Sequence, residues 1–197
     1  MLVYVDPNGV QQIANNLLFS ERSSSFQGGV TIGVPMVNFE LKQEFSSMQQ
    51  ISSLMPETLA ESVYAKLKPQ EVKETIDVIR LVDKNGKRKI LPGSALLLTG
   101  TIKFMDRFDT KDFNPLEPDP ISVKQYRLHG EDVFVASVFD DPFFIPVYFP
   151  FVAKEQVPYS NGQDVSVLGV CKWVPPYRPG SGSFIELALR ASAMWIN

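Results

Sequence analysis

Aspartates stand at the ends of several apolar segments that the sequence predicts as strands. Asp6 ends the first of these segments, Asp106 follows the second, and Asp140 follows a later one. Carboxylates that converge from strand ends can hold Mg²⁺ and support phosphoryl transfer. Aspartate is, however, also an ordinary residue of turns and helix N-caps. A metal-dependent phosphodiesterase or nuclease using these three aspartates and Mg²⁺ is therefore the alternative function and not the leading one.

Basic residues gather around the Asn85-Gly86 pair, which is the strongest short signal for a β-hairpin. They are Lys84, Lys87, Arg88 and Lys89. A hairpin tip with this charge can grip the phosphate of a nucleotide or of a nucleic-acid backbone. Hairpin tips are also lysine-rich for solubility alone. We expect a phosphate-bearing small ligand to be bound here if the protein binds one at all.

Two stretches of the chain share one pattern. Leu97 to Met105 reads L-L-T-G-T-I-K-F-M, and Ser166 to Val174 reads S-V-L-G-V-C-K-W-V. Apolar and β-branched residues predict a strand in each stretch, and a glycine within a strand marks a bulge, a bend or a close backbone approach. Two bent strands of this kind suggest related positions in one curved sheet or small barrel. Duplication and chance similarity both remain open.

Each of these stretches carries a lysine followed by a large aromatic residue. The pairs are Lys103-Phe104 and Lys172-Trp173. If the two strands are neighbours, the lysines could add to a phosphate-binding surface and the rings could stack on bases. Both rings could equally belong to the core.

The segment from Phe143 to Phe151 combines five aromatic residues with prolines at every fourth position. Proline cannot donate to a strand ladder, so we expect an edge strand or an extended surface segment. Alternation places Phe144 and Tyr148 on the face opposite to the other apolar residues of this segment. These two residues, with Phe151, are predicted to contact a second copy of the chain, another protein or the protein's own C-terminal segment. The alternative is that the segment closes the protein's own core.

Cysteine and histidine each occur once, as Cys171 and His129. One of each excludes an internal disulfide or a Cys/His zinc cluster within one chain and fits a reducing compartment. Cys171 falls in an apolar segment, where cysteine usually acts as a small hydrophobic residue. A Cys171–His129 nucleophile pair is therefore not expected. The chain also carries neither a P-loop nor a G-x-S-x-G motif.

Composition is that of an ordinary globular protein. The 197 residues are 44% hydrophobic and 21% charged, with a formal net charge of −3. This charge gives no reason to expect general affinity for nucleic acid or anionic membranes. The N-terminus lacks the features of a signal peptide, and no apolar run reaches the roughly 20 residues that span a bilayer. We expect one cytosolic domain, with possible lobes at 1–69 and 70–197.

The first 20 residues carry the clearest local signals. Leu2 to Val5 is predicted as a strand, and Asp6-Pro7 as the N-cap and first residue of a helix. The apolar face of that helix is formed by Val10, Ile13, Ala14, Leu17 and Leu18. This opening resembles that of an uncharacterised family of small bacterial proteins, which begin with an apolar-Tyr-apolar-Asp strand followed by such a helix. The resemblance implies a bacterial origin and brings no established activity.

The other predicted elements alternate between the two types. A second helix should begin at Pro56 and end before Pro69, and a hairpin should span Ile76 to Leu91. Asp132 to Phe139 is a further strand, whereas Phe184 to Ile196 fits either a helix or a strand. The predicted fold class is α+β, with N-terminal helices and then a mainly antiparallel curved sheet or partial barrel. The leading function is a non-enzymatic binding or regulatory module that acts through a protein interface or as a homo-oligomer.

Overall fold

The computed structural model describes residues 1–19, 54–67, 69–71, 93–105, 125–140, 143–158, 161–173 and 187–197. The hairpin predicted for Ile76 to Leu91, and with it Lys84, Lys87 and Arg88, lies outside these residues, as does Asp106. In chain order the elements are β1 (Leu2–Val5), α1 (Pro7–Phe19), α4 (Pro56–Lys66), β2 (Gln70–Glu71), β3 (Ala95–Met105), β4 (Tyr126–Leu128), β5 (Glu131–Asp140), β6 (Phe143–Pro150), the 3₁₀ helix η1 (Phe151–Glu155), β7 (Gln163–Trp173) and β8 (Leu187–Ile196).

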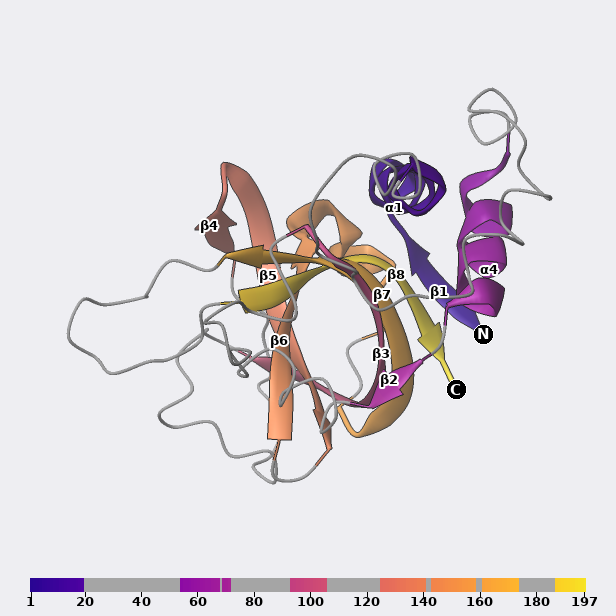
Figure 1. The fold of residues 1–197 in the computed structure, drawn as a ribbon. Helices are drawn as coiled ribbons and strands as arrows, with labels where there is room; N and C mark the ends of the chain where they lie inside the picture. Colours follow the sequence, from indigo (N-terminus) through magenta and orange to yellow (C-terminus); the bar gives the residue numbers. More distant parts are fainter. Residues whose placement is uncertain are drawn as a thin grey trace, which may run out of the picture.

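Five strands close into a barrel, which Figure 1 shows nearly end-on. Around the barrel the order is β3, β7, β8, β6 and β5, and β5 pairs again with β3. Strand β3 is long enough to pair with two neighbours in turn: its first part pairs with β7, and its last part pairs with β5. Four of the five contacts in this ring are antiparallel, and the contact between β6 and β8 is parallel.

The barrel is strongly staggered. A path through registered partners leaves β3 at Phe104 and passes Ala136, Val147, Leu189 and Cys171. It returns to β3 at Ser94, whose carbonyl accepts a hydrogen bond from the Cys171 amide at 2.9 Å. The return point is ten residues from the start. This stagger tilts the strands steeply and leaves an interior that side chains fill.

Aromatic rings occupy a large part of that interior. Phe134 stacks on Phe149 with ring centroids 5.1 Å apart, and Phe104 lies 6.3 Å from Phe134. Tyr4 of β1 adds an edge-on contact with Phe149 at 5.5 Å. The four rings are at most 4% exposed. They belong to one cluster with the inward-facing aliphatic residues of the barrel strands.

Strand β6 corrects the prediction for the proline-rich segment. It was expected at an edge or on the surface, but it pairs with β5 along its whole length and with β8 at Val147 and Tyr148. Alternate residues of a strand direct their N–H groups to the same neighbour. Pro146 and Pro150 therefore remove donors from one edge of β6 only. Donors missing from one edge are compatible with the contact between β6 and β8, in which only two residues of β6 are paired.

Strand β1 and helix α1 confirm the predictions for the N-terminus. The amide of Asn8 donates to the Asp6 carboxylate at 3.1 Å, which is the N-cap interaction. Val10, Ile13 and Ala14 are at most 2% exposed, whereas the side chains of Leu17 and Leu18 lie outside the described residues. Strand β1 pairs with β8 from Ala193 to Trp195, on the edge that β6 uses further back. It thus extends the wall of the barrel beyond the short β6–β8 contact.

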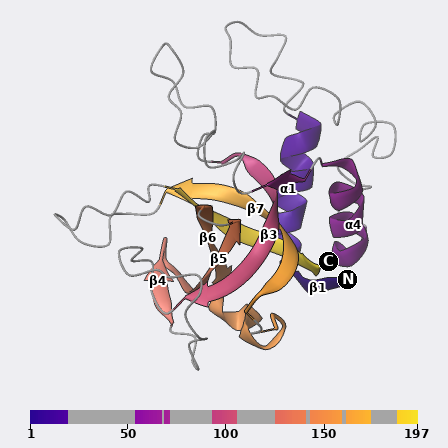
Figure 2. The ribbon, with the colours of Figure 1, turned by 90° about the horizontal axis from the view of Figure 1, so that it is seen from below.

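Helices α1 and α4 lie side by side against one side of the barrel (Figures 1 and 2). Helix α4 begins at Pro56 and ends before Pro69, as predicted. Leu59, Ala60 and Val63 are buried against α1 and the outer side of the barrel. The Trp195 indole N–H donates to the Glu61 carboxylate at 3.0 Å. We call this the helix-covered face; its strand residues are Leu97, Leu168, Val170, Ala193 and Trp195.

The two stretches with a shared pattern fall in β3 and β7, which are adjacent antiparallel strands. Gly169 lies at a shift in the β7–β8 register, where any side chain would collide with the backbone of Arg190. Gly100 instead lies in an unbroken ladder opposite Val165, one residue before β3 begins to pair with β5 as well. The prediction of a close backbone approach is therefore confirmed for Gly169, and Gly100 coincides with the point where β3 changes neighbours.

The C-terminal segment forms strand β8. From the sequence, this segment was predicted to be either a helix or a strand. Its backbone pairs with β7 from Leu187 to Ile196, and Ala188, Ala191 and Ala193 fit closely packed positions on the two faces. Sheet pairing has thus overridden a helical spacing of apolar residues. Among the described residues, the fold combines two α-helices with a mainly antiparallel, closed sheet. The α+β prediction holds at this coarse level, with strands predominating.

Candidate functional site

A polar pair lies among the outward-facing residues of strands β3, β5 and β6. The inward residues of these strands include Phe104, Ala136 and Val147, so their sequence neighbours point outward. The register places Lys103 of β3 opposite Ser137 of β5. Ser137 in turn lies opposite Pro146 of β6. We call the outward side of β3, β5 and β6 the β5–β6 face.

Both members of the polar pair are deeply buried. Lys103 is 6% exposed and Ser137 is fully buried. The Ser137 hydroxyl has no hydrogen-bond partner among the described residues. A buried polar group left without a partner costs about 1–3 kcal/mol. A face that only completed the core would be more stable with an apolar residue at this position.

Half-buried aromatic residues form the next row of the β5–β6 face. Phe139 of β5 lies between Thr101 of β3 and Phe144 of β6 in the register. All three are partly accessible, in contrast to the row of Ser137. Because residues i and i+2 of a strand are about 7 Å apart, the rings lie one short step from the polar pair. We call Thr101, Phe139 and Phe144 the rim row.

Tyr148 lies on the same face but is not available at the surface. It is 1% exposed and packs with Val133, Val135, Leu128 and Ala188. Burial raises the pKa of its hydroxyl above the usual value, and the nearby charge of Arg190 opposes that shift only in part. Tyr148 therefore contributes to the protein's own packing. The predicted contact residue Phe144 remains half-buried on the rim row.

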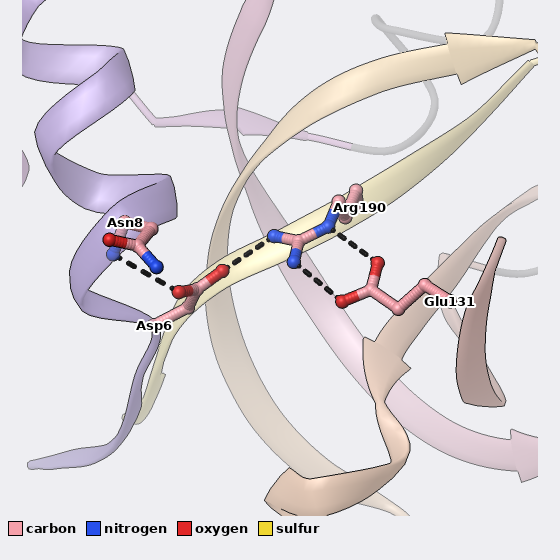
Figure 3. Close-up of polar contacts among 4 residues, drawn as sticks. All are labelled: Asp6, Asn8, Glu131 and Arg190. Carbon is pink, nitrogen blue, oxygen red and sulfur yellow. Dashed lines mark hydrogen bonds and ion pairs between the residues drawn. The ribbon is translucent and has the colours of Figure 1, made fainter. Parts of the chain in front are cut away.

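Arg190 of β8 forms a three-residue ionic network with Asp6, which follows β1, and Glu131, the first residue of β5 (Figure 3). Its guanidinium donates to both oxygens of Glu131 at 3.0 and 2.7 Å, and to Asp6 at 2.6 Å. Burial alone would lower the pKa of Arg190, but hydrogen bonds to Glu131 and Asp6 and their charges raise it above the usual value. The network joins the start of α1 to the start of β5 across the short β6–β8 contact.

The predicted metal ligands Asp6 and Asp140 can be located relative to this network. Asp6 is bonded to Arg190, and through it to Glu131 at the first residue of β5. Asp140 is the last residue of β5, so an extended strand separates it from Glu131 by about 30 Å. Asp106 lies outside the described residues. The structure therefore does not bring Asp6 and Asp140 together at one metal site.

The predicted cationic residues are likewise separated. Leu96 pairs with Gly169, and with this register Lys172 falls opposite residue 93 of the chain. Residue 93 is ten positions from Lys103, or about 33 Å along an extended strand. Lys103 and Lys172 thus lie at opposite ends of the β3–β7 pair. Lys103 joins Phe144 and Tyr148 on the β5–β6 face instead.

The remaining candidate residues have structural positions. Cys171 is 2% exposed inside the barrel, and burial raises the pKa of its thiol to about 12, which suppresses the reactive thiolate. His129 is exposed in the turn between β4 and β5, at a φ of 51°. Phe104 is 2% exposed in the core and cannot stack on a base. Phe151 packs against the core, with the Lys154 ammonium 5.5 Å from its ring centroid.

Sequence reasoning missed Ser137 and Phe139, although a signal was present. Along β5 the outward residues run Val133, Val135, Ser137 and Phe139. A single hydroxyl in such an apolar alternation is an irregularity that could have been noticed. Its position opposite Lys103 could not be known, because the register between β3 and β5 is set by tertiary pairing.

Comparison with known proteins assigns no family: the chain matches no protein-family model and no curated protein sequence. Within the described residues, no cluster of three or more histidine, cysteine, aspartate or glutamate side chains is placed to hold a metal ion. Neither described helix has the length and apolar character needed to cross a membrane.

Proposed function

We propose that this protein is a non-enzymatic binding module that takes a nucleotide, or a similar small phosphate-bearing ligand, at the rim of the β5–β6 face. The observation that carries this proposal is the fully buried, unpartnered hydroxyl of Ser137 opposite the nearly buried Lys103. Proteins tend to keep such unfavourable polar positions where function requires them. A lysine and a serine hydroxyl are suitable donors to phosphate oxygens.

The barrel topology supports the same location. In barrel order the first strand, β3, lies between the second and fourth, and the third strand, β6, runs parallel to the fifth, β8. A short helix, η1, joins the third and fourth strands. We infer from this arrangement a likeness to the oligonucleotide/oligosaccharide-binding fold, a five-stranded barrel in which the face of the second and third strands binds ligands. Those strands correspond here to β5 and β6. Fold alone does not establish function, so the side chains carry the argument.

The rim row indicates the other half of the ligand. Phe139 and Phe144 are directly opposite each other and half-buried, so they can flank or stack on a flat ring. The polar pair lies one row further in, at the distance that separates i and i+2 along a strand. A molecule with an aromatic base and a phosphate would match both. Since Ser137 is fully buried, binding requires local opening at the rim.

A protein contact is the second candidate, and the half-buried Phe144 is the observation that favours it. Phe144 and Phe151 would form such a contact with a second copy or another protein, whereas Tyr148 is too deeply buried to take part. Light scattering on the purified chain tests this proposal. A dimer that Phe144→Glu converts to a monomer would support it, and a monomeric wild type would count against self-association. The separation of Asp6 from Asp140 gives no comparable support to a phosphodiesterase.

Isothermal titration calorimetry with the four ribonucleoside 5′-monophosphates at low salt tests the nucleotide proposal. Wild-type protein should bind at least one of them, and Ser137→Ala and Lys103→Met should each weaken binding about tenfold or more. Each variant has a matched control. Ser166→Ala removes another fully buried serine, on β7, and Lys172→Met removes the lysine at the far end of the β3–β7 pair.

Three outcomes would count against the proposal. Wild-type protein that ignores all four nucleotides at low salt would remove it. Equal losses in Ser137→Ala and Ser166→Ala would show that general destabilisation, and not the site, controls binding. Tight binding of single-stranded oligonucleotides without binding of mononucleotides would assign a longer ligand, for which the cations at Lys84, Lys87 and Arg88 would be the next residues to reverse to glutamate.

A further inference from the structure

Asp164 lies at the end of the rim row, on the strand beside β3. Thr101 is registered with both Asp164 of β7 and Phe139 of β5, and Phe139 is registered with Phe144. Four outward side chains therefore follow one line across four strands. They are, in order, a carboxylate, a hydroxyl and two aromatic rings.

The carboxylate in this line is oriented and accessible. The Thr101 hydroxyl donates to Oδ1 of Asp164 at 3.1 Å, which fixes the direction of the carboxyl group. Asp164 is exposed, and its second oxygen, Oδ2, has no hydrogen-bond partner among the described residues. An ionised carboxylate accepts hydrogen bonds only, so it suits a ligand that presents hydroxyl or amino donors.

The spacing of the row matches the parts of a nucleotide. Neighbouring strands are about 4.8 Å apart, so Asp164 lies about 10 Å from Phe139 across the row, with Thr101 between them. A base stacked at Phe139 and Phe144 would place its sugar over Thr101. The sugar hydroxyls would then reach Asp164, and the 5′-phosphate would turn toward Lys103 and Ser137 in the next row. The negative charge of Asp164 also disfavours a phosphate at that end.

We propose that Asp164, oriented by Thr101, selects ligands that carry ribose hydroxyls, so that the site takes ribonucleotides in preference to their deoxy forms. This inference rests on the proposed nucleotide-binding function. It goes further in assigning the sugar and the residue that recognises it. The competing explanation is an ordinary hydrogen bond between exposed side chains of two paired strands, with no ligand involved.

Calorimetry with one nucleobase and three sugars tests this inference. The ligands are the 5′-monophosphate that wild-type protein binds best and its 2′-deoxy and 2′,3′-dideoxy analogues. Wild-type protein should bind the dideoxy analogue at least about tenfold more weakly than the ribonucleotide, because the carboxylate would lose its donors. Asp164→Asn should bind the ribonucleotide more weakly and lose most of the discrimination. Thr101→Val should lose part of it.

The control variant is Glu57→Gln, which removes an exposed carboxylate on α4, remote from the row. It should retain both the affinity and the discrimination. Equal affinity for the three sugars would overturn the role of Asp164 while leaving the nucleotide site intact. Discrimination that survives in Asp164→Asn would assign the recognition of the sugar to another residue. No binding of any nucleotide would instead remove the proposed function itself.

Discussion

The two outward sides of the barrel differ in what their strands present. On the helix-covered face, apolar residues of β3, β7 and β8 meet the apolar sides of α1 and α4. On the β5–β6 face, the buried positions include a lysine and a serine, and the serine hydroxyl has no partner among the described residues. The first arrangement is what burial of apolar area produces when stability is the only requirement. The second departs from it at two adjacent positions.

This difference distinguishes a scaffold from a candidate site within one barrel. On the helix-covered face, the indole N–H of Trp195 donates to Glu61, and the buried hydroxyl of Ser166 on the same side of β7 donates to Asn197. The hydroxyl of Ser137 has no such partner in the part of the chain that the structure describes. Substitutions on the first face should therefore reduce stability, whereas the corresponding substitution on the second should reduce binding and leave stability intact.

The largest effect is expected on the helix-covered face. Ile13 lies on α1 and is fully buried against the barrel and α4. Ile13→Asp would therefore place an unpaired charge in an apolar contact. The free energy of unfolding should fall by about 4 kcal/mol or more. Chemical denaturation monitored by circular dichroism measures this change. Gln12→Asp, at the exposed neighbouring position, is the control, and equal stability of the two variants would contradict the packing of α1.

A smaller loss is expected beneath that face, at the β7–β8 register shift. Gly169→Val adds a side chain where the Arg190 backbone leaves no room, so the strands must separate locally. We expect a loss of about 2–4 kcal/mol in the free energy of unfolding, despite the better strand propensity of valine. Gly100→Val, in the unbroken ladder, is the comparison and should cost less. Thermal melts that rank the two variants in the opposite order would refute the assignment.

A change of pH should affect the barrel interior, which both faces share. The pKa of the Cys171 thiol rises from 9.0 to about 12 on burial. Above pH 9 the unfolded chain loses a proton that the folded protein keeps. The free energy of unfolding should therefore fall by up to about 1.4 kcal/mol per pH unit between pH 9 and 12. Below pH 9 this contribution to stability is fully present.

Cys171→Ala isolates this contribution, because it removes the only thiol of the chain. The variant should show a flatter stability profile between pH 8 and 10 than wild-type protein, whatever its absolute stability. Above pH 10 the buried Tyr4 and Tyr148, whose pKa values burial also raises, add a similar decline in both proteins. Identical slopes below pH 10 would mean that the thiol ionises without opposing the folded state.

The smallest effect on stability is expected at the β5–β6 face. Ser137→Ala removes a hydroxyl that makes no hydrogen bond to any described residue, so the free energy of unfolding should stay the same or rise by up to about 1 kcal/mol. Ser166→Ala, at another fully buried serine, loses the hydrogen bond to Asn197 and should cost about 0.5–1.5 kcal/mol. A clear loss of stability in Ser137→Ala would show that this hydroxyl supports the fold and would weaken the case for a site.

Local sequence signals located most of the described elements. The strand at Leu2 to Val5, the helix capped by Asp6 and the helix at Pro56 all depend on interactions within a few residues, and they were predicted with nearly correct bounds. The position of the proline-rich strand β6 in the sheet was predicted wrongly. The prolines show which backbone N–H donors are missing, but they do not show which neighbouring strands pair with β6. Strand β8 was undecided for the same reason: its apolar spacing suits both structures until β7 is beside it.

The candidate site was predictable only in fragments. Lys103 and Phe144 were identified from charge and from aromatic content, and were assigned to different functions. The structure brings them to one face because β5 pairs with β3 on one edge and β6 on the other. Such a grouping depends on strand order and register across more than 40 residues of chain. A functional role for Ser137 or Asp164 can be inferred only when that strand order and register are known.

The position of β8 has a consequence for how the chain folds during synthesis. This strand pairs with β7, β6 and β1, and the Met1 ammonium and the Ile196 carbonyl are joined by a hydrogen bond at 2.6 Å. The barrel therefore cannot close until residue 196 has left the ribosome. Until then, β1 and one edge of β6 remain unpaired, because β8 is their native neighbour there. Contacts this distant in sequence slow folding and expose open strand edges to aggregation. Chains stalled before residue 187 should accordingly be protease-sensitive and dependent on chaperones, because they lack all of β8.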